Sequence, residues 1–380
     1  MSKNHILHIA MFGHKHMLSR EGGIEIVVNE LCTRMVAQGH CVVCFDRNSK
    51  HVSKDEALEQ KKEYKGVKIV PVWTVDKKGI AAMTSSLSAV FYVIKNDYDI
   101  VHIHAEGPAA VCGLLHFLWK RKKKNKKIVV TIHGLDWARA KWSWFAKKYI
   151  KFGEKQAVKY ADEIIVLSRG IQEYFQNEYG RKTVFIPNGI SKPIIQNPNE
   201  IKQLWCLEKN SYVLFLGRIV PEKGLQYLIE AWKEIKTDKK LVIAGGSSDT
   251  DDFVSELKQQ SPRDVVFTGF QEGRVLEELY SNAYIYCLPS DLEGMPLSLL
   301  EAMSYGNCCL VSDIAECTEV VENNAVVFKK SDVLDLKMKL QELLDDDERV
   351  AEYKRNASEY ICTKYNWNSV IDKTLNLYRD

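Results

Sequence analysis

Two glutamates stand eight positions apart at the start of an expected helix. Glu293 is followed directly by Gly294, and Glu301 comes about one turn into the helix, in the stretch SDLEGMPLSLLE. Gly permits a tight entry into a helix, and Pro296 favours its first turn. The free N–H groups at a helix N-terminus, here from Gly294 to Leu297 and including Met295, attract phosphate. This arrangement can hold the two ends of a sugar nucleotide, with Glu293 toward the sugar and Glu301 toward the ribose. The alternative is a capped surface helix with an ordinary solvated glutamate.

Two cations follow an expected strand at residues 212–216. Arg218 and Lys223 lie in the segment LGRIVPEKG, where both could reach one pyrophosphate. Arg offers a fork of donors and Lys a compact charge. Without a metal, such cations would offset the charge that develops on a departing diphosphate. The competing interpretation is two solvated surface cations.

Two segments of the first half also end expected strands. Gly22 and Gly23 come after the first strand and just before a helix, where paired glycines let the backbone approach a ligand. Glu25 either faces that ligand or only stabilises the helix dipole. His133 ends the strand at residues 128–133, so we expect it to face the ligand-binding edge of the sheet; the alternative is a structural histidine.

Charged and aromatic residues follow His133. Asp136, Trp137 and Arg139 form a cluster suited to an acceptor or a lipid interface, and the sequence does not separate these options from a packed loop. In the second half, Phe270 follows a strand, where a nucleobase can stack. Asp249-Thr250-Asp251 resembles a metal-binding DxD, but its polar surroundings favour a solvated turn, and no metal site is expected. Gly245-Gly246 lacks the spacing of a dinucleotide site.

Short apolar segments alternate with helical periodicity along the chain, which predicts parallel α/β domains. A polar segment at residues 190–210 is interpreted as a linker. We expect an α/β fold of two doubly wound, Rossmann-like domains that face a cleft, with ligands at the carboxyl ends of the strands. The expected strands are 6–12, 41–45, 67–72, 100–104, 128–133, 163–168 and 183–187, and then 212–216, 241–244, 265–268, 284–288, 308–312 and 325–328.

The two halves differ in charge. Residues 1–190 carry 31 Lys and Arg against 18 Asp and Glu, a net charge of +13, whereas the remainder carries 22 against 32, a net of −10. The densest basic run, Lys120–Lys127, is either a solvated loop or a contact for anionic lipid headgroups. No nucleic-acid-binding motif accompanies it. The chain lacks a membrane-length apolar run and a secretory pattern, and its scattered cysteines suit reduced thiols, so a cytoplasmic location is expected.

The motifs together resemble the Glu-x7-Glu, Arg-x4-Lys, Gly-rich-loop and His-Gly motifs of retaining family 4 glycosyltransferases, which have the GT-B fold. The resemblance covers nearly the whole chain and extends to enzymes of bacterial capsule and O-antigen assembly. It implies an N-terminal acceptor-binding domain at residues 1–190 and a nucleotide-sugar-binding domain at residues 191–364. In such enzymes a terminal helix, here residues 365–380, crosses back onto the first domain.

The same resemblance implies the roles of the residues. Arg218 and Lys223 would neutralise the leaving diphosphate, Glu293 would orient the sugar, Glu301 would bind the ribose, and His133 would position the sugar. Transfer would proceed with retention, without metal or other cofactor, from UDP-sugar ahead of GDP- and dTDP-sugars, with dTDP-rhamnose still possible. The acceptor would be a saccharide, undecaprenyl-linked, at the inner face of the plasma membrane. Two alternatives remain: an epimerase or phosphorylase on the same fold, and a non-catalytic sugar-nucleotide-binding subunit.

Overall fold

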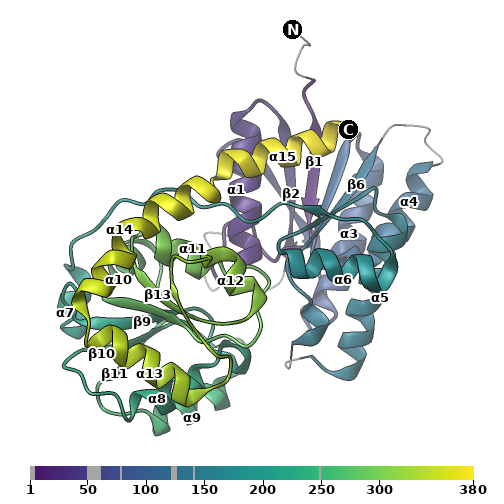
Figure 1. Ribbon diagram of the computed structural model, residues 1–380. Coiled ribbons are helices and arrows are strands. Elements are labelled where there is room, and N and C mark those ends of the chain that lie inside the picture. The colour runs from purple at the N-terminus through teal and green to yellow at the C-terminus, as the bar shows by residue number, and fades with distance from the viewer. Residues whose placement is uncertain (1–4, 49–60, 78, 121–125, 140–141, 248–249) are drawn as a thin grey trace. The chain divides into compact units, whose positions relative to one another are not determined.

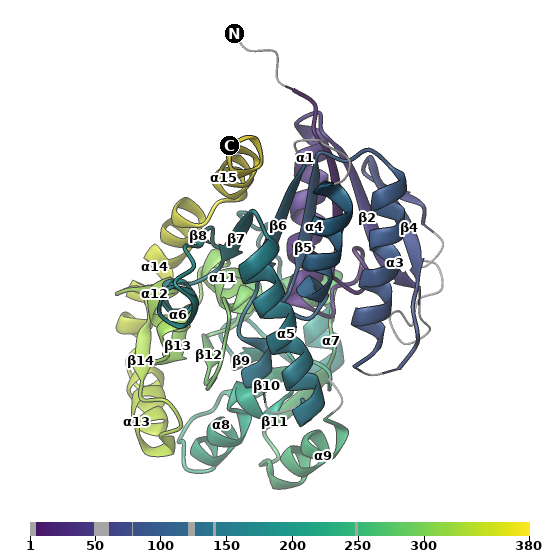
Figure 2. The same cartoon turned by 90° about the vertical axis from the view of Figure 1, so that its right-hand side faces the viewer.

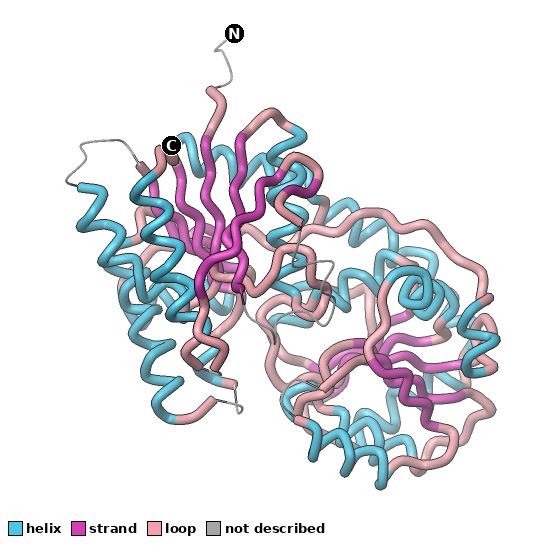
Figure 3. The backbone as a smooth tube through the Cα atoms, turned by 180° about the vertical axis from the view of Figure 1, so that it is seen from behind, coloured by secondary structure: helices cyan, strands magenta, loops and turns pink. Residues whose placement is uncertain are grey.

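The computed structural model describes residues 5–48, 61–77, 79–120, 126–139, 142–247 and 250–380 (Figure 1). The chain forms two compact units: Met1–Gly189 together with Trp367–Asp380, and Ile190–Asn366. Each unit contains its own sheet flanked by helices (Figure 3), which confirms the expected α/β class. In the described part of the chain, no helix is both long and apolar enough to cross a bilayer.

The first unit is built on an eight-stranded sheet in which every neighbouring pair is parallel except β3 and β4. The spatial order is β3 (Glu63–Tyr64), β4 (Val67–Trp73), β2 (Cys41–Asn48), β1 (His8–Phe12), β5 (Ile100–His104), β6 (Lys127–Ile132), β7 (Glu163–Val166) and β8 (Val184–Phe185). Strand β1 is central: Met11 pairs with Cys44 of β2 and with His102 of β5. The loops after β1, β2, β5 and β6 therefore meet at one edge of the sheet.

Helices cover both faces of this sheet. The chain moves one way from β1 to β2 and the other way from β4 through β7, so right-handed crossovers place the connecting helices on opposite faces. One face carries α1 (Gly23–Ala37), which contacts α15 (Trp367–Arg379). The other carries α3 (Ala81–Lys95), α4 (Cys112–Lys120), α5 (Trp144–Tyr160) and α6 (Arg169–Tyr179), and Figure 2 shows the first three side by side.

The second unit has a six-stranded parallel sheet. The spatial order is β11 (Val265–Gly269), β10 (Lys240–Ala244), β9 (Tyr212–Leu216), β12 (Ile285–Leu288), β13 (Cys308–Ser312) and β14 (Val326–Phe328). Its helices are α7 (Glu200–Trp205), α8 (Leu225–Trp232), α9 (Asp251–Gln260), α10 (Gly273–Asn282), α11 (Leu297–Ser304), α12 (Ala315–Val321), α13 (Val333–Leu344) and α14 (Asp347–Lys364). The strand order reverses next to β9, so the loops after β9 and β12 flank the point where such sheets bind ligands.

Helix α7 corrects the expectation of a linker at residues 190–210. The fully buried carboxylate of Glu278 accepts hydrogen bonds from the backbone N–H groups of Asn199, Glu200 and Ile201, at 2.9, 2.7 and 3.2 Å. These are N–H groups that a helix cannot satisfy internally at its start, so the distant carboxylate stabilises a short helix in a polar segment.

Helix α15 belongs to the first unit although it follows the second in sequence. Its Tyr378 hydroxyl lies 2.6 Å from Nδ1 of His102, and the ammonium of Lys127 donates to the carbonyl of Leu377 at 2.7 Å. At its start, the Trp367 ring fills the space beside Gly189, where an added Cβ would come within 2.5 Å of the ring. Buried contacts at both ends therefore fix this helix on the sheet.

Candidate functional site

The loop after β12 brings Glu293 and Lys223 together. The carboxylate oxygen Oε1 of Glu293 lies 2.5 Å from the ammonium of Lys223 and accepts a hydrogen bond of 2.6 Å from the hydroxyl of Ser290. The two charged side chains are only 8% and 12% exposed. A pair this shielded from water is held much more firmly than a surface salt bridge, so the two predicted site residues form one unit.

Close backbone contacts fix the loops that carry this pair. Gly224 has a φ of +69°, and an added Cβ would lie 1.8 Å from the carbonyl oxygen of Pro289. Beside it, the backbone N–H of Asp291 donates to the carbonyl of Glu222 at 2.9 Å. The loop after β9 and the loop after β12 are thus joined directly, which sets the spacing between Lys223 and Glu293.

Helix α11 follows at once and carries Glu301. Pro296 is the N-cap residue, and Gly294 and Met295 lie buried in front of it, so the first N–H groups of the helix, from Leu297 on, begin next to Glu293. Glu301 is half-buried, and the hydroxyl of Tyr280 donates to its Oε2 at 2.9 Å. Tyr280 is itself fully buried, and burial, with Glu301 beside it, raises its pKa, so it remains a donor.

The other predicted donor-site residues of the second unit lie at the same edge of the sheet. Arg218 is half-buried directly after β9, and Phe270 is 47% exposed directly after β11. Gly245 has a φ of +155°, and an added Cβ would lie 1.8 Å from the carbonyl oxygen of Gly217, so the β9 and β10 loops approach closely. The edge thus presents two cations, two carboxylates, an aromatic ring and a helix N-terminus.

The described residues of the DxD segment, Thr250 and Asp251, lie at the start of a helix. Asp251 begins α9 and accepts a hydrogen bond of 2.6 Å from Ser247, while the hydroxyl of Thr250 donates to the carbonyl of Ile219 at 2.6 Å. Asp249 lies outside the described residues. The described part of the segment therefore starts a helix, where acidic residues favour the positive end of the helix dipole.

In the first unit, His133 belongs to a chain of histidines. Its Nε2 lies 2.9 Å from Nδ1 of His104, whose ring stacks on His102 with centroids 4.3 Å apart. Burial lowers the pKa of His102 to about 3 and that of His133 to about 4, and it holds the pKa of His104 well below its usual value. All three imidazoles are therefore neutral at pH 7, and His133 acts as a hydrogen-bonding group without charge.

This histidine chain gives a testable pH dependence. Unfolded histidines titrate near pH 6.5, so between that pH and about pH 4 the unfolded chain binds protons that the folded chain excludes. Stability should consequently fall as the pH drops through this window. We expect melting temperatures measured from pH 7.5 to 5.0 to fall less steeply in His102→Gln than in the wild type. The exposed His8→Gln is the matched control; equal slopes in all three proteins would contradict the prediction.

Two carboxylates fix the loop that runs from the end of β1 to Gly22. Asp46 at the end of β2 accepts hydrogen bonds from the backbone of Met17, at 3.2 Å to each oxygen, and lies 2.7 Å from Nε2 of His14. Glu25 is 6% exposed and accepts from the backbone N–H of Lys15 at 2.9 Å. Glu25 therefore organises the loop before its own helix, a role that neither of the two sequence interpretations included.

Gly22 and Gly23 form the junction between this loop and α1. Gly22 is the N-cap of the helix, and Gly23 is its first residue. A Cβ at Gly22 would lie 2.2 Å from Oε2 of Glu25, so the glycine leaves room for that carboxylate to fold back over the helix start. Gly22 thus leaves space at the helix start, and the buried carboxylate of Glu25 fixes the backbone there.

Trp137, one of the predicted acceptor residues, contacts a buried glutamate. Trp137 donates from its indole N–H to Oε2 of Glu154 at 3.1 Å, and the ammonium of Lys151 lies 3.0 Å from Oε1. Glu154 is fully buried, and it also accepts hydrogen bonds from Tyr174 and Tyr179. Burial acts to raise its pKa, but hydrogen bonding, first from Glu106 and then from Tyr179 and Lys151, leaves the pKa below its usual value. Glu154 is therefore an ionised hub that orients Trp137.

Asp136 and Arg139 are fixed beside that hub. Their side chains form an ion pair of 3.0 Å, and the backbone N–H of Asp136 donates to Oε2 of Glu106 at 3.0 Å. Burial, and then the nearby charges of Asp136 and Glu154, raise the pKa of Glu106 well above its usual value. As the pH falls, Glu106 therefore takes up a proton before Glu154 does, because two neighbouring buried carboxylates disfavour being charged together.

Comparison with known proteins assigns the family. The family model described as Glycosyltransferase Family 4 matches residues 21–192, and the one described as Glycosyl transferases group 1 matches residues 197–360. The chain belongs to the family 4 glycosyltransferases. Its motifs at Gly22, His133, Arg218, Lys223 and Glu293 all fall within these matched ranges.

Individual relatives of this glycosyltransferase are distant. The UDP-Gal:alpha-D-GlcNAc-diphosphoundecaprenol alpha-1,3-galactosyltransferase of Escherichia coli is 27% identical over 322 residues, covering 79% of this chain and 80% of that protein. The N,N'-diacetylbacillosaminyl-diphospho-undecaprenol alpha-1,3-N-acetylgalactosaminyltransferase of Campylobacter jejuni is 27% identical over 236 residues, covering 59% and 62%. The structure of Anabaena HepE in complex with UDP-glucose matches with a TM-score of 0.80 at 17% identity, covering 97% and 99%. The fold is GT-B.

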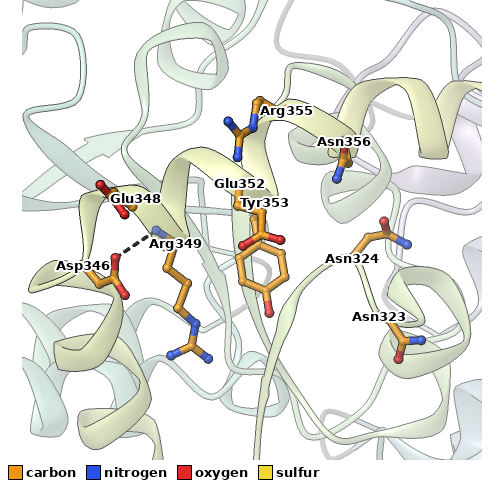
Figure 4. A pocket seen from close by; sticks show the side chains of 9 residues that line it. All are labelled: Asn323, Asn324, Asp346, Glu348, Arg349, Glu352, Tyr353, Arg355 and Asn356. Atoms are coloured by element: carbon orange, nitrogen blue, oxygen red, sulfur yellow. Dashed lines mark hydrogen bonds between the residues drawn. The ribbon is translucent and has the colours of Figure 1, made fainter.

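One hollow in the second unit of the glycosyltransferase lies away from these motifs. It has a volume of about 560 Å³ and is lined by polar residues of α14 and of the loop before β14, shown in Figure 4. Asn324 precedes β14, so the hollow opens at the amino ends of the strands, whereas Lys223 and Glu293 follow the carboxyl ends. The hollow is therefore separate from the edge that carries the motifs.

Several residues that shape the site of the glycosyltransferase were not predicted. His104 and Glu106 lie in HIHAE at the end of a buried strand, where two histidines and an acid are unusual enough to have signalled a polar site. Asp46, Glu154 and Tyr280 act through distant partners, and nothing in their local sequence indicates those contacts. Of the basic run, residues 121–125 lie outside the described part of the chain.

Proposed function

We propose that this glycosyltransferase moves a sugar from UDP-sugar to a lipid-linked saccharide in the assembly of a bacterial surface polysaccharide. In this proposal the configuration at the anomeric carbon is retained and no metal takes part. The second unit holds the donor and the first holds the acceptor. The relatives of Escherichia coli and Campylobacter jejuni act on undecaprenyl diphosphate-linked saccharides, which supports this acceptor class.

The shielded contact between Lys223 and Glu293 carries the proposal. An ammonium has three donors, and Glu293 occupies one direction, so Lys223 can still donate to a diphosphate. Arg218 on the same edge adds a second cation for the leaving group. Because Lys223 is already held by Glu293 before the donor arrives, little reorganisation of this cation is needed when charge develops on the departing diphosphate.

The two carboxylates bind different parts of the donor. Glu293 lies in front of the start of α11 and faces the sugar, where it orients hydroxyl groups and stabilises positive character at the anomeric carbon. Glu301 lies within α11 with its carboxylate oriented by Tyr280, and it accepts from the ribose hydroxyls. The exposed ring of Phe270 serves the nucleobase.

The first unit contributes polarity without an obvious nucleophile. His133 is neutral at pH 7, so it positions the sugar through a hydrogen bond. We favour a front-face reaction in which an oxygen of the leaving phosphate takes the proton of the acceptor hydroxyl. Asp136, Trp137 and Arg139, held by Glu154 and its partners, line the acceptor side.

A thermal-shift panel of UDP, GDP, dTDP and their common sugars, with and without EDTA, tests the donor class. A ligand at 100 times its Kd stabilises the folded state by about 2.7 kcal/mol, which raises the melting temperature by roughly 5–10 °C for a unit of this size. We expect UDP and one UDP-sugar to give such a shift and to keep it in EDTA. A shift that disappears with EDTA would overturn the metal-free proposal, and no shift with any nucleotide would overturn the nucleotide-sugar donor.

The variant Glu301→Gln adds a test of ribose binding to this panel. If Glu301 accepts from both ribose hydroxyls, UDP should stabilise the wild type more than 2′-deoxy-UDP does, and the variant should lose most of that difference. Glu256→Gln, an exposed position on α9, is the matched control. Once a donor is known, the anomeric configuration of the product, read by NMR, decides between retention and inversion.

A further inference from the structure

The outer face of α5 combines aromatic residues with lysines. All six of its exposed side chains fall within an arc of about 100° at 3.6 residues per turn: Trp144, Phe145, Lys148, Phe152, Lys155 and Lys159. The three aromatic side chains are 61%, 78% and 50% exposed in chain order. The ammonium of Lys148 lies 3.7 Å from the centre of the Trp144 ring. Apolar and cationic groups are therefore intermixed on one surface.

Neighbouring helices extend this surface. Helix α4 exposes Leu114 and Phe117, and α3 exposes Phe91 and Tyr92. The three helices lie side by side in Figure 2. Among the described residues of the first unit, nine large hydrophobic side chains are exposed, and seven of them lie on α3, α4 and α5. Exposed hydrophobic side chains that cluster in this way mark an interaction site, whereas singly scattered ones are normal on a protein surface.

The same surface lacks acidic side chains. The sequences of α3 and α4 contain no Asp or Glu, and Glu154, the one acid of α5, is fully buried against Trp137 and Lys151. The exposed charges on α5 are therefore all positive. An anionic partner fits this pattern.

We propose that the α3–α5 surface docks onto an anionic lipid bilayer. Trp and Phe side chains favour the boundary between headgroups and acyl chains, and lysines on the same helix bind anionic headgroups. Embedded aromatics and flanking lysines would orient the first unit on the membrane, where a lipid-linked saccharide is presented. The reason for docking rests on the proposed function, whereas the docking itself can be measured without sugar transfer.

Of the basic run Lys120–Lys127, the structure describes the side chains of Lys126 and Lys127, and both are engaged within the first unit. Lys126 pairs with Asp97 at 3.0 Å and is 5% exposed, and the ammonium of Lys127 is held by the carbonyl of Leu377. Neither of these lysines presents its charge outward. The lysines on α5 are exposed and stand beside aromatic side chains, so they can act together with them.

A second copy of the chain fits this surface less well. Protein interfaces are depleted in lysine at their centres. On α5 the lysines lie on the same face as the aromatic residues, so a dimer would bury several like charges against one another. A bilayer lets each ammonium reach a phosphate while the rings lie deeper.

Co-sedimentation of the full chain with vesicles tests the proposal. Vesicles contain phosphatidylcholine alone or with 30% phosphatidylglycerol. The test variants are a triple charge reversal, Lys148→Glu with Lys155→Glu and Lys159→Glu, and a pair of aromatic replacements, Trp144→Ser with Phe145→Ser. The charge-matched control reverses three exposed lysines of the second unit, Lys209→Glu, Lys236→Glu and Lys258→Glu.

We expect the wild type to bind the anionic vesicles and each test variant to bind at least about tenfold more weakly, in line with the loss of lysines from an anionic surface. The control should bind like the wild type. Equal loss in the control, or unchanged binding in both test variants, would overturn the surface. So would wild-type binding that does not require phosphatidylglycerol, or a dimer in solution that the aromatic replacements dissociate.

The nucleotide panel separates this proposal from the proposed function. The side chains replaced in the two test variants are exposed and distant in sequence from the donor motifs, so these variants should keep the UDP-induced thermal shift of the wild type. Vesicle binding without any nucleotide shift would overturn the function and leave the surface standing. A nucleotide shift without vesicle binding would do the reverse.

Discussion

Glu293→Gln is expected to lower sugar transfer by about 10²- to 10³-fold, the range measured when one preorganised electrostatic group is removed from an active site. Glutamine keeps the size of the side chain and can still accept from Ser290, but it removes the charge that faces Lys223 at 2.5 Å. The loss should fall on kcat, because the group acts where positive character develops on the sugar.

UDP binding by the same variant should be unchanged or tighter. With its partner uncharged, Lys223 turns its whole charge toward the diphosphate, so the Kd of UDP, measured by calorimetry, should not rise. Glu256→Gln on α9 serves as the control for a charge change at an exposed site of the same unit. A variant that kept more than half of the wild-type kcat, or that lost UDP binding in parallel with kcat, would remove Glu293 from the proposed role.

Gly224→Ala should destabilise the second unit by at least about 2 kcal/mol, since a residue with a side chain in left-handed backbone already costs of the order of 1–3 kcal/mol. Here the φ is +69°, and the new Cβ would also lie 1.8 Å from the carbonyl oxygen of Pro289. The β9 and β12 loops would have to separate, which shifts Lys223 relative to Glu293. We therefore expect a lower melting temperature by roughly 5–10 °C together with weaker UDP binding.

Gly273→Ala is the matched control for this effect. Gly273 has a φ of +57° in the same unit, but an added Cβ there would meet no atom within 4 Å. It should therefore show the cost of left-handed backbone alone, about 1–2 kcal/mol. Equal destabilisation by the two replacements would mean that the contact with Pro289 does not hold the loops together.

The fold was predictable because its signals are local and repeated. Alternating apolar strands and helical periods gave the class of the protein and most strand positions to within two residues, as with β4 at Val67–Trp73. The two-residue strand β3 was missed, because it is too short to show alternation. Helix α7 was missed because its start is stabilised by Glu278, which lies 77 to 79 residues away in the sequence.

Residues of the site were predictable only where they belong to a sequence motif. Arg218 and Lys223 were recognised as cations for one diphosphate, yet their sequence does not reveal that Lys223 contacts Glu293, which lies 70 residues further on. Likewise, the hydrogen bond between Tyr280 and Glu301 and the one between His104 and His133 depend on which strands are neighbours. Pairing between distant segments is a property of the folded sheet, and a single sequence does not encode it in any local pattern.

The position of α15 bears on how the protein is made. A ribosome delivers residues 1–189 first, but the helix that buries Tyr378 against His102 emerges only after the whole of residues 190–366. The second unit is contiguous and can fold as soon as it leaves the exit tunnel, since domains generally fold as units during synthesis. The first unit must wait without the helix that packs beside α1 on its sheet. Chains that end at Asn366 and have been released from the ribosome should therefore be cleaved by protease in the first unit while the second resists.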